Sequence, residues 1–461
     1  MNLDTIREDL LSIADSGLKY ASNKLPNAEI ELYLSQSSMV IVDIQGGMVM
    51  ARDSVYSGSA VRVYNNRKKA FACTSGVNLD NLKSTIDEAI SISNSISFVD
   101  ERFNSLFTPN GKKTSNEGII DPDVLQLNSK VIGKEANKLV EDCKIDPKIV
   151  SISGTREVSS GAFAIVNTSG VSSASRYTIN AGDVSVVAKE GNKQNSSFDF
   201  CITRNIKDFD LTNLGMNASK EALSLLNSKP LGKSEILPVV WEYLPASLYL
   251  MTALNAPISG KSVVEGDSYF ADKIGDNVAI NTLQIIDDGQ LPEALSTNAI
   301  DKEGVPSQVT TIIDNGVLKS YITDTYYGHL LDTPSTGNAK RSGNPSYEAL
   351  PGISSNTLSV KPSNTNSLDK IVEEIDYGIY LKGFLLGMGH TNPITGDMSA
   401  VSPSAYLVEN GEIKYPLDAV NIAGNIYKSL KNISVIGSDV KLTPFGVKTP
   451  TLVVDGFTAT G

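Results

Sequence analysis

The spacing of apolar residues changes from a helical period to a strand-like one within the first forty residues. Apolar side chains recur every three or four residues over 4–25, which predicts an amphipathic helix. Ile30, Leu32 and Leu34 then alternate with polar residues, as in a half-buried strand. Further strands are predicted at 39–45, 48–53, 57–64 and 69–74. Short turns between them favour antiparallel hairpins, and a second helix is expected at 79–95.

The same order of elements then occurs a second time. Residues 97–124 are polar and rich in turn formers, and we interpret them as a linker. A helix is predicted at 124–143 and another at 211–226, on either side of a strand-rich stretch. The strands of this stretch are predicted at 149–156, 162–167, 171–188 and 195–203. Helices packed on antiparallel sheets define an α+β fold for the N-terminal half.

The pattern beyond residue 229 is mostly that of strands and turns. A short helical stretch is expected at 245–254. Asn315-Gly316 and Asn410-Gly411 each separate two strand-like runs, which is the signature of a hairpin with a type I′ turn. The C-terminal half is therefore predicted to be mostly β. The predicted organisation is an N-terminal α+β unit at 1–96, a linker at 97–124, a central α+β unit at 125–228 and a β-rich domain at 229–461.

Composition and charge restrict the function classes. The 461 residues carry 40 Lys and Arg against 52 Asp and Glu, so the net charge is −12 and nucleic acid is not expected as a partner. The three cysteines lie far apart, which fits a reducing compartment. No signal peptide or membrane span is apparent. We therefore predict a cytoplasmic protein without a membrane partner.

Motifs that carry well-known chemistry are largely missing. Gly260-Lys261-Ser262 lacks the earlier glycine of a P-loop, and no G-x-S-x-G nucleophile motif occurs. The only histidines are His329 and His390, so no helical pair of zinc-binding histidines exists. His390 lies in a glycine- and polar-rich loop, which is either an ordered turn or part of a site. The segment 335–339 is open to the same two interpretations.

Several short blocks stand out in the C-terminal half: Asp287-Asp288-Gly289, Asp301–Pro306 (DKEGVP), Asp314–Tyr321 (DNGVLKSY), Ser335–Arg341 (STGNAKR), Thr391–Ser399 (TNPITGDMS), Glu409–Ile413 (ENGEI) and Ala423-Gly424-Asn425. Together these blocks resemble the TldD/PmbA family, also labelled modulators of DNA gyrase. The resemblance covers nearly all of 229–461, whereas the N-terminal half shares mainly the layout of helices and strands.

The resemblance implies where a metal site would lie and that this chain lacks it. One branch of the family carries a zinc motif, H-E-x-x-x-H, on a helix, with a later cysteine as a further ligand. At the matching positions this chain has Met251, Thr252 and Ala256, and the stretch 435–447 contains no cysteine. The chain therefore resembles the PmbA/TldE-like branch. No catalytic residue, metal ligand or cofactor is expected in the chain itself.

The resemblance also implies partners. TldE-like chains pair with a TldD-like zinc metallopeptidase that degrades unfolded polypeptides or trims precursor peptides, and the zinc is expected in that partner. A dimer is expected, with the partner or with a second copy. The candidate peptide-cleft residues are His390, Asn392, Thr395, Gly396, Asp397, Gly337 and Asn338. The alternatives are a stand-alone homodimeric peptide-binding module, and a hydrolase without zinc that uses His390 with Asp397 or Ser399.

Overall fold

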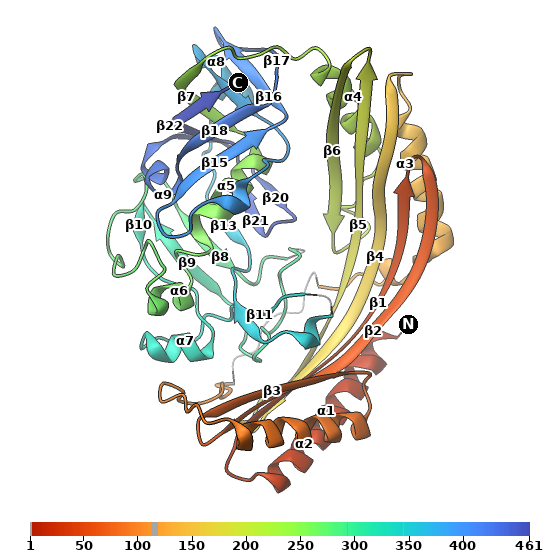
Figure 1. The fold of residues 1–461 in the computed structure, drawn as a ribbon, viewed down its shortest axis with the longest axis vertical. Helices are drawn as coiled ribbons and strands as arrows, with labels where there is room; N and C mark the ends of the chain where they lie inside the picture. The colour runs from red at the N-terminus through yellow and green to blue at the C-terminus, as the bar shows by residue number, and fades with distance from the viewer. Residues whose placement is uncertain (1, 112–118, 293, 344) are drawn as a thin grey trace.

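The computed structural model describes residues 2–111, 119–292, 294–343 and 345–461. A long, curved sheet from the N-terminal half faces a β-rich C-terminal body across its concave side (Figure 1). The N-terminal half contains α1 (Leu3–Lys24), β1 (Glu29–Gln45), β2 (Met48–Asn65), β3 (Lys68–Ser75), α2 (Leu79–Ser95), η1 (Val124–Gln126), α3 (Ser129–Cys143), β4 (Ile149–Asn167), β5 (Ser172–Glu190), β6 (Lys193–Thr203) and α4 (Leu214–Leu225).

The predicted α+β class is confirmed, and the strands of both predicted units belong to one antiparallel sheet. Its order is β3-β2-β1-β4-β5-β6, so β1 and β4 join the two units through a ladder that pairs residues 31–45 with 153–167. The separately predicted strands at 30–34 and 39–45 are one strand, β1. The polar residues between them, Ser35 to Ser38, remain in the ladder because both neighbouring strands pair with them. The sequence suggested a break there because the apolar alternation stops.

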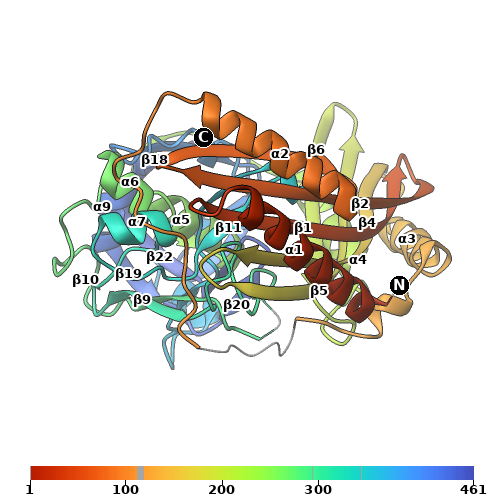
Figure 2. The same cartoon turned by 90° about the horizontal axis from the view of Figure 1, so that it is seen from below.

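The four long helices of this half cover one face of the sheet. Even-numbered residues of β1 and β4 point to that face, because side chains alternate along a strand. Leu32 and Ala164 pack with α1 and α2, and Val42 and Val158 pack with α3 and α4. Figure 2 shows α1 and α2 lying across the strands at one end of the sheet. The odd-numbered residues face the C-terminal body.

The predicted helix at 124–143 is split at Asn128. Its side-chain oxygen accepts hydrogen bonds from the backbone N–H groups of Lys130 and Val131, so Asn128 is the N-cap of α3, and η1 lies before it. Of the predicted linker, residues 112–118 lie outside the described residues. In the described part, Phe103 is buried and stacks on Tyr64, with 3.7 Å between ring centroids.

The described residues of the C-terminal body form three sheets. Their orders are β10-β9-β8-β13-β21-β20, β11-β12, and β15-β18-β22-β7-β14-β16-β17 with β19 paired to β22. The elements are β7 (Ser234–Trp241), α5 (Tyr243–Leu254), α6 (Gly260–Glu265), β8 (Ile285–Asp288), β9 (Val309–Asp314), β10 (Val317–Leu318), α7 (Thr325–Leu330), β11 (Ala339–Arg341), η2 (Ser346–Glu348), β12 (Pro351–Ile353), β13 (Leu358–Val360), α8 (Leu368–Glu373), β14 (Tyr377–Leu381), η3 (Met388–His390), β15 (Asp397–Ser402), β16 (Ala405–Glu409), β17 (Glu412–Leu417), β18 (Val420–Asn425), α9 (Ile426–Ser429), η4 (Leu430–Asn432), β19 (Ile433–Ile436), β20 (Lys441–Thr443), β21 (Val447–Thr449) and β22 (Leu452–Thr460).

The mostly β character of this half is therefore confirmed. Both Asn-Gly hairpins form, and Asn315 and Asn410 have φ values of +49° and +52°, as a type I′ turn requires. The first of them is shorter than predicted, because β10 ends at Leu318. Trp241, at the end of β7, is fully buried in the main apolar core of this body.

Buried charges connect the sheet to the C-terminal body. Arg62 on β2 donates to Glu31 on β1 at 2.7 Å and to Glu303 at 2.9 Å. Arg341 on β11 donates to the second oxygen of Glu31 at 3.2 Å. These four side chains, which we name the interface network, are almost inaccessible to water. Within the described ranges, no helix is long and apolar enough to cross a membrane.

Candidate functional site

Helix α5 carries the positions at which the resemblance implies a zinc motif. Most of its residues are buried, because it is apolar on nearly every side and lies within the main core of the C-terminal body. Met251 packs against that core, and the Thr252 hydroxyl donates to the carbonyl oxygen of Leu248 at 2.8 Å. Ala256 lies in a turn beyond the last helical residue. All three side chains are partly accessible.

Two regions that lie far from this helix in the sequence pack against it. The residues of η3, which include His390, pack against α5, and so do those of β20 and β21. The stretch 435–447 therefore reaches the helix through β20. His390 is exposed, and its backbone N–H donates to the carbonyl oxygen of Gly387 at 2.9 Å.

The side chains at this corner do not fit a zinc ion. A thioether, a hydroxyl group already donated to the backbone and a methyl group replace the imidazole and carboxylate groups that zinc prefers. Across the described residues, no group of three or more His, Cys, Asp or Glu side chains is placed to hold a metal. No catalytic step through zinc follows from this chain's own residues.

The loop after η3 binds mainly to itself. The Asn392 side chain accepts hydrogen bonds from the N–H groups of Ile394 and Thr395. The Asp397 carboxylate accepts from the Thr395 hydroxyl at 2.8 Å and from the Asn425 amide at 2.9 Å. These bonds lower the pKa of Asp397, Asn425 contributing most. The structure thus brings four of the candidate residues, Asn392 and 395–397, into one ordered surface loop.

Gly396 and Ser399 also have defined contacts in and beside this loop. Gly396 has φ +80°, and a Cβ atom there would lie 2.4 Å from the ring of Tyr427, so the turn requires glycine. The Ser399 hydroxyl donates to the side-chain oxygen of Asn421 at 2.9 Å. Among the described residues, no hydrogen bond links His390 to Asp397 or Ser399. In this arrangement the Ser399 hydroxyl is bonded to Asn421, and the Asp397 carboxylate to Thr395 and Asn425.

The two remaining candidates, Gly337 and Asn338, belong to a different cluster. Asn338 is fully buried and donates to Asp287 at 2.7 Å and to the carbonyl oxygen of Ser354 at 3.0 Å. Asn356 also donates to Asp287, from its backbone and from its side chain. Burial raises the pKa of Asp287, while these bonds oppose the shift. The amide of Asn338 is therefore occupied inside the protein.

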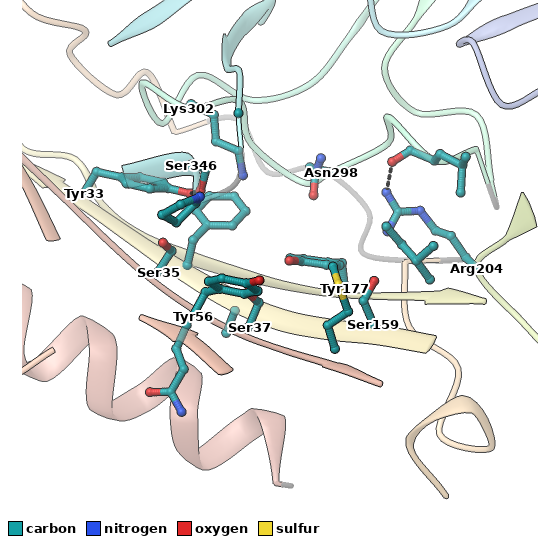
Figure 3. A pocket seen from close by; sticks show the side chains of 18 of the residues that line it. Tyr33, Ser35, Ser37, Tyr56, Ser159, Tyr177, Arg204, Asn298, Lys302 and Ser346 are labelled. Carbon is teal, nitrogen blue, oxygen red and sulfur yellow. Dashed lines mark hydrogen bonds between the residues drawn. The ribbon is translucent and has the colours of Figure 1, made fainter. Parts of the chain in front are cut away.

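The sequence interpretation missed a cavity of about 330 Å³ between the concave face of the sheet and the C-terminal body. Lys302 and Asn298 reach into it from the body, opposite Ser37, Tyr56 and Tyr177 on the sheet (Figure 3). The available signal was the run of polar residues that interrupts the apolar alternation of β1. The sequence alone could not show the cavity, because contacts between distant segments decide which residues of the body face this polar run.

Comparison with known proteins places this architecture in a defined class. The structure of TldE from Thermococcus kodakarensis superposes with a TM-score of 0.86 at 22% identity, covering 97% of this chain and 100% of that one. A putative modulator of a DNA gyrase from Thermotoga maritima gives the same TM-score at 23% identity, covering 97% and 99%. The fold is therefore that of the TldE and gyrase-modulator structures.

Sequence comparison gives the family. Models of the PmbA/TldA metallopeptidase match in three parts: domain 1 at residues 30–93, the central domain at 120–226 and the C-terminal domain at 234–461. A metalloprotease TldD homolog from Buchnera aphidicola is 26% identical over 88% of this chain and 86% of its own length. A metalloprotease PmbA homolog from Haemophilus influenzae is 30% identical over 58% and 55%. The chain belongs to the PmbA/TldD family.

Proposed function

We propose that this chain is the non-catalytic, TldE-like subunit of a cytoplasmic, two-chain zinc metallopeptidase that degrades unfolded polypeptides or trims precursor peptides. The observation that carries the proposal is the side-chain chemistry at α5. Met251, Thr252 and Ala256 offer no zinc ligand and no general base, although the chain belongs to a family named for metallopeptidases. The zinc and the catalytic glutamate would come from a TldD-like partner.

The proposal gives the chain a structural part in catalysis. The short helix η3, which ends at exposed His390, packs against α5, and the ordered loop at 391–397 follows it directly in the chain. In the complex these residues would help enclose an extended substrate near the partner's zinc. Exposed loops on a rigid scaffold are suited to such contacts. The two chains would form a heterodimer.

Co-expression with a family member that carries H-E-x-x-x-H tests this function. We expect the two chains to co-purify and to cleave casein, an unfolded substrate, faster than the partner alone. Thr252→Val should leave the activity within twofold, because Thr252 bonds only to its own helix. A partner that is fully active alone and never co-purifies would contradict the proposal.

Elemental analysis of the chain purified alone provides the second measurement. We expect zinc well below one atom per chain. One tightly held zinc per chain would refute the non-catalytic role. A chain that self-associates and binds unfolded peptides without any partner would instead support the homodimeric peptide-binding module.

A further inference from the structure

The sheet forms a polar floor for the cavity. Ser37 on β1 is paired with Tyr56 on β2 and with Gly161 on β4, and Gly161 is paired with Tyr177 on β5. These four residues thus form one row across the sheet. A Cβ atom at Gly161 would lie 2.9 Å from the Tyr177 ring, so the ring lies over the glycine. The row presents two phenol groups and a serine hydroxyl to the cavity.

Lys302 is held over this floor by its own backbone. The Asp301 carboxylate accepts hydrogen bonds from the N–H groups of Glu303 and Val305, and the N–H of Lys302 donates to Ala339 at 2.9 Å. These bonds fix the segment that carries Lys302. The backbone bonds alone thus position the side chain toward the cavity, and no bond to its ammonium group is needed for this.

The ammonium of Lys302 lacks an anion. Its nitrogen lies 3.1 Å from the ring centroid of Phe163 and 5.8 Å from that of Tyr33. In the part of the chain that the structure describes, this nitrogen makes no ion pair or hydrogen bond. Burial, and then the charges of Lys340 and Arg341, lower the pKa of Lys302 well below its ordinary value. A cation placed in this way gains most from a bound anion.

The charges that act on Lys302 favour a bound anion, because Lys340, Arg341 and Arg204 are positive and only Asp301 is negative. Arg204 is buried, and its guanidinium donates to four backbone carbonyl groups, so four of its five N–H donors are already used. At the other end of the cavity stands Glu157, six residues before Phe163 on β4 and so roughly 20 Å away along the strand. At that separation Glu157 does not oppose a carboxylate bound at Lys302.

We propose that the cavity binds a carboxylate ligand with an apolar or aromatic body, its carboxylate on Lys302 and its body against Tyr33, Tyr56 and Phe163. The volume lies at the small end of the range for small-molecule sites. The carboxylate can belong to a free organic acid or to the end of a short peptide. The site is separate from the α5 corner and goes beyond the proposed function.

Binding would take up a proton. The carboxylate of the ligand raises the pKa of Lys302 in the complex above its lowered value in the free protein, so affinity falls as pH rises from the free-state to the bound-state pKa. The other groups that act on Lys302 are Asp301, Lys340, Arg341 and Arg204, and of these only Asp301 favours the charged form.

Isothermal titration calorimetry of the full chain tests the site. The probes are N-acetylphenylalanine, its amide and the free-acid tripeptide Ala-Ala-Phe. We expect both acids to bind at least tenfold more tightly than the amide, with proton uptake seen as a heat that depends on the buffer. A tighter tripeptide would identify a peptide end as the ligand, and a tighter N-acetylphenylalanine a small acid. Equal affinity of acid and amide, or no binding of either acid at millimolar concentration, would overturn the proposal.

Variants of this chain test whether the acids bind in this cavity. Lys302→Met keeps the stem of the side chain and is expected to weaken binding of the acids tenfold or more, whereas Tyr56→Ala removes a ring that contacts the body of the ligand and weakens it several-fold. Lys361→Met changes an exposed lysine of the same body and serves as the matched control. Unchanged affinity in Lys302→Met would refute the site. Should that variant fail to fold, Tyr56→Ala and the acid–amide comparison decide.

Discussion

Replacing Arg62 by methionine tests whether the interface network holds the sheet against the C-terminal body. Arg62 is 5% exposed and pairs with Glu31, 1% exposed, and Glu303, 3% exposed. After the change, Glu31 keeps Arg341, whereas Glu303 keeps only the backbone N–H of Thr325 at 2.9 Å. An uncompensated buried charge costs about 3–5 kcal/mol, and the free energy of unfolding is expected to fall by that amount.

The control for this change lies on the same strand. Arg52 pairs with Asp43 at 3.1 Å, but the two side chains are 59% and 25% exposed, so Arg52→Met should cost less than about 1 kcal/mol. Urea unfolding followed by the fluorescence of Trp241, the single tryptophan, measures both variants. Adding Glu303→Gln to Arg62→Met should recover part of the loss. Equal losses in the two single variants would refute the reasoning.

Three further predictions concern buried groups. Burial, followed by the Glu303 carboxylate, raises the pKa of Asp324 to about 7, so the folded state holds a proton that the unfolded chain releases near pH 4. Stability should therefore fall as pH rises from about 4 to about 7. Asp324→Asn should remove this part of the pH dependence. Relative to wild type, its free energy of unfolding in urea titrations should rise by more than about 1 kcal/mol between pH 5 and pH 7.5. The same pH dependence in both proteins would contradict the prediction. Asn338→Leu takes a donor from buried Asp287 and should lower the free energy of unfolding by about 1–3 kcal/mol, and a neutral result would show that Asn356 suffices. Burial raises the pKa of the Cys143 thiol to about 11, so this thiol should react with a thiol reagent at pH 8 only after unfolding, and rapid labelling of the native protein would argue against its burial.

Elements set by local patterns were predictable from the sequence, and pairings between distant segments were not. The apolar spacing of 4–25 and the Asn-Gly turn at 410–411 gave α1 and the β16–β17 hairpin correctly. The joining of β1 to β4 depends on a ladder between strands about a hundred residues apart, which no local pattern encodes.

The same distinction explains the candidate sites. The segment around Asn338 is polar and rich in turn formers, so the sequence allowed either a site or an ordered turn, and only the contact with Asp287 shows where its amide is used. Lys302 lies in the DKEGVP block that carried the family resemblance, yet its position over Phe163 required the sheet to be in place. The residue types around Asn338 and Lys302 predicted that these segments are polar. They did not predict which side chains of other segments face them.

The pairing of β1 with β4 has a consequence for synthesis on the ribosome. β1 can form a hairpin with β2 as soon as both strands have left the ribosome. Its other edge stays unpaired until β4, about a hundred residues later in the chain, has been synthesised. At 5–20 residues per second, that edge stays open for roughly 5–20 s. An open strand edge is a template for pairing with another molecule. Nascent chains that stall before residue 149 should therefore stick to one another, and a chaperone that shields β1 during this interval would raise the yield of folded protein.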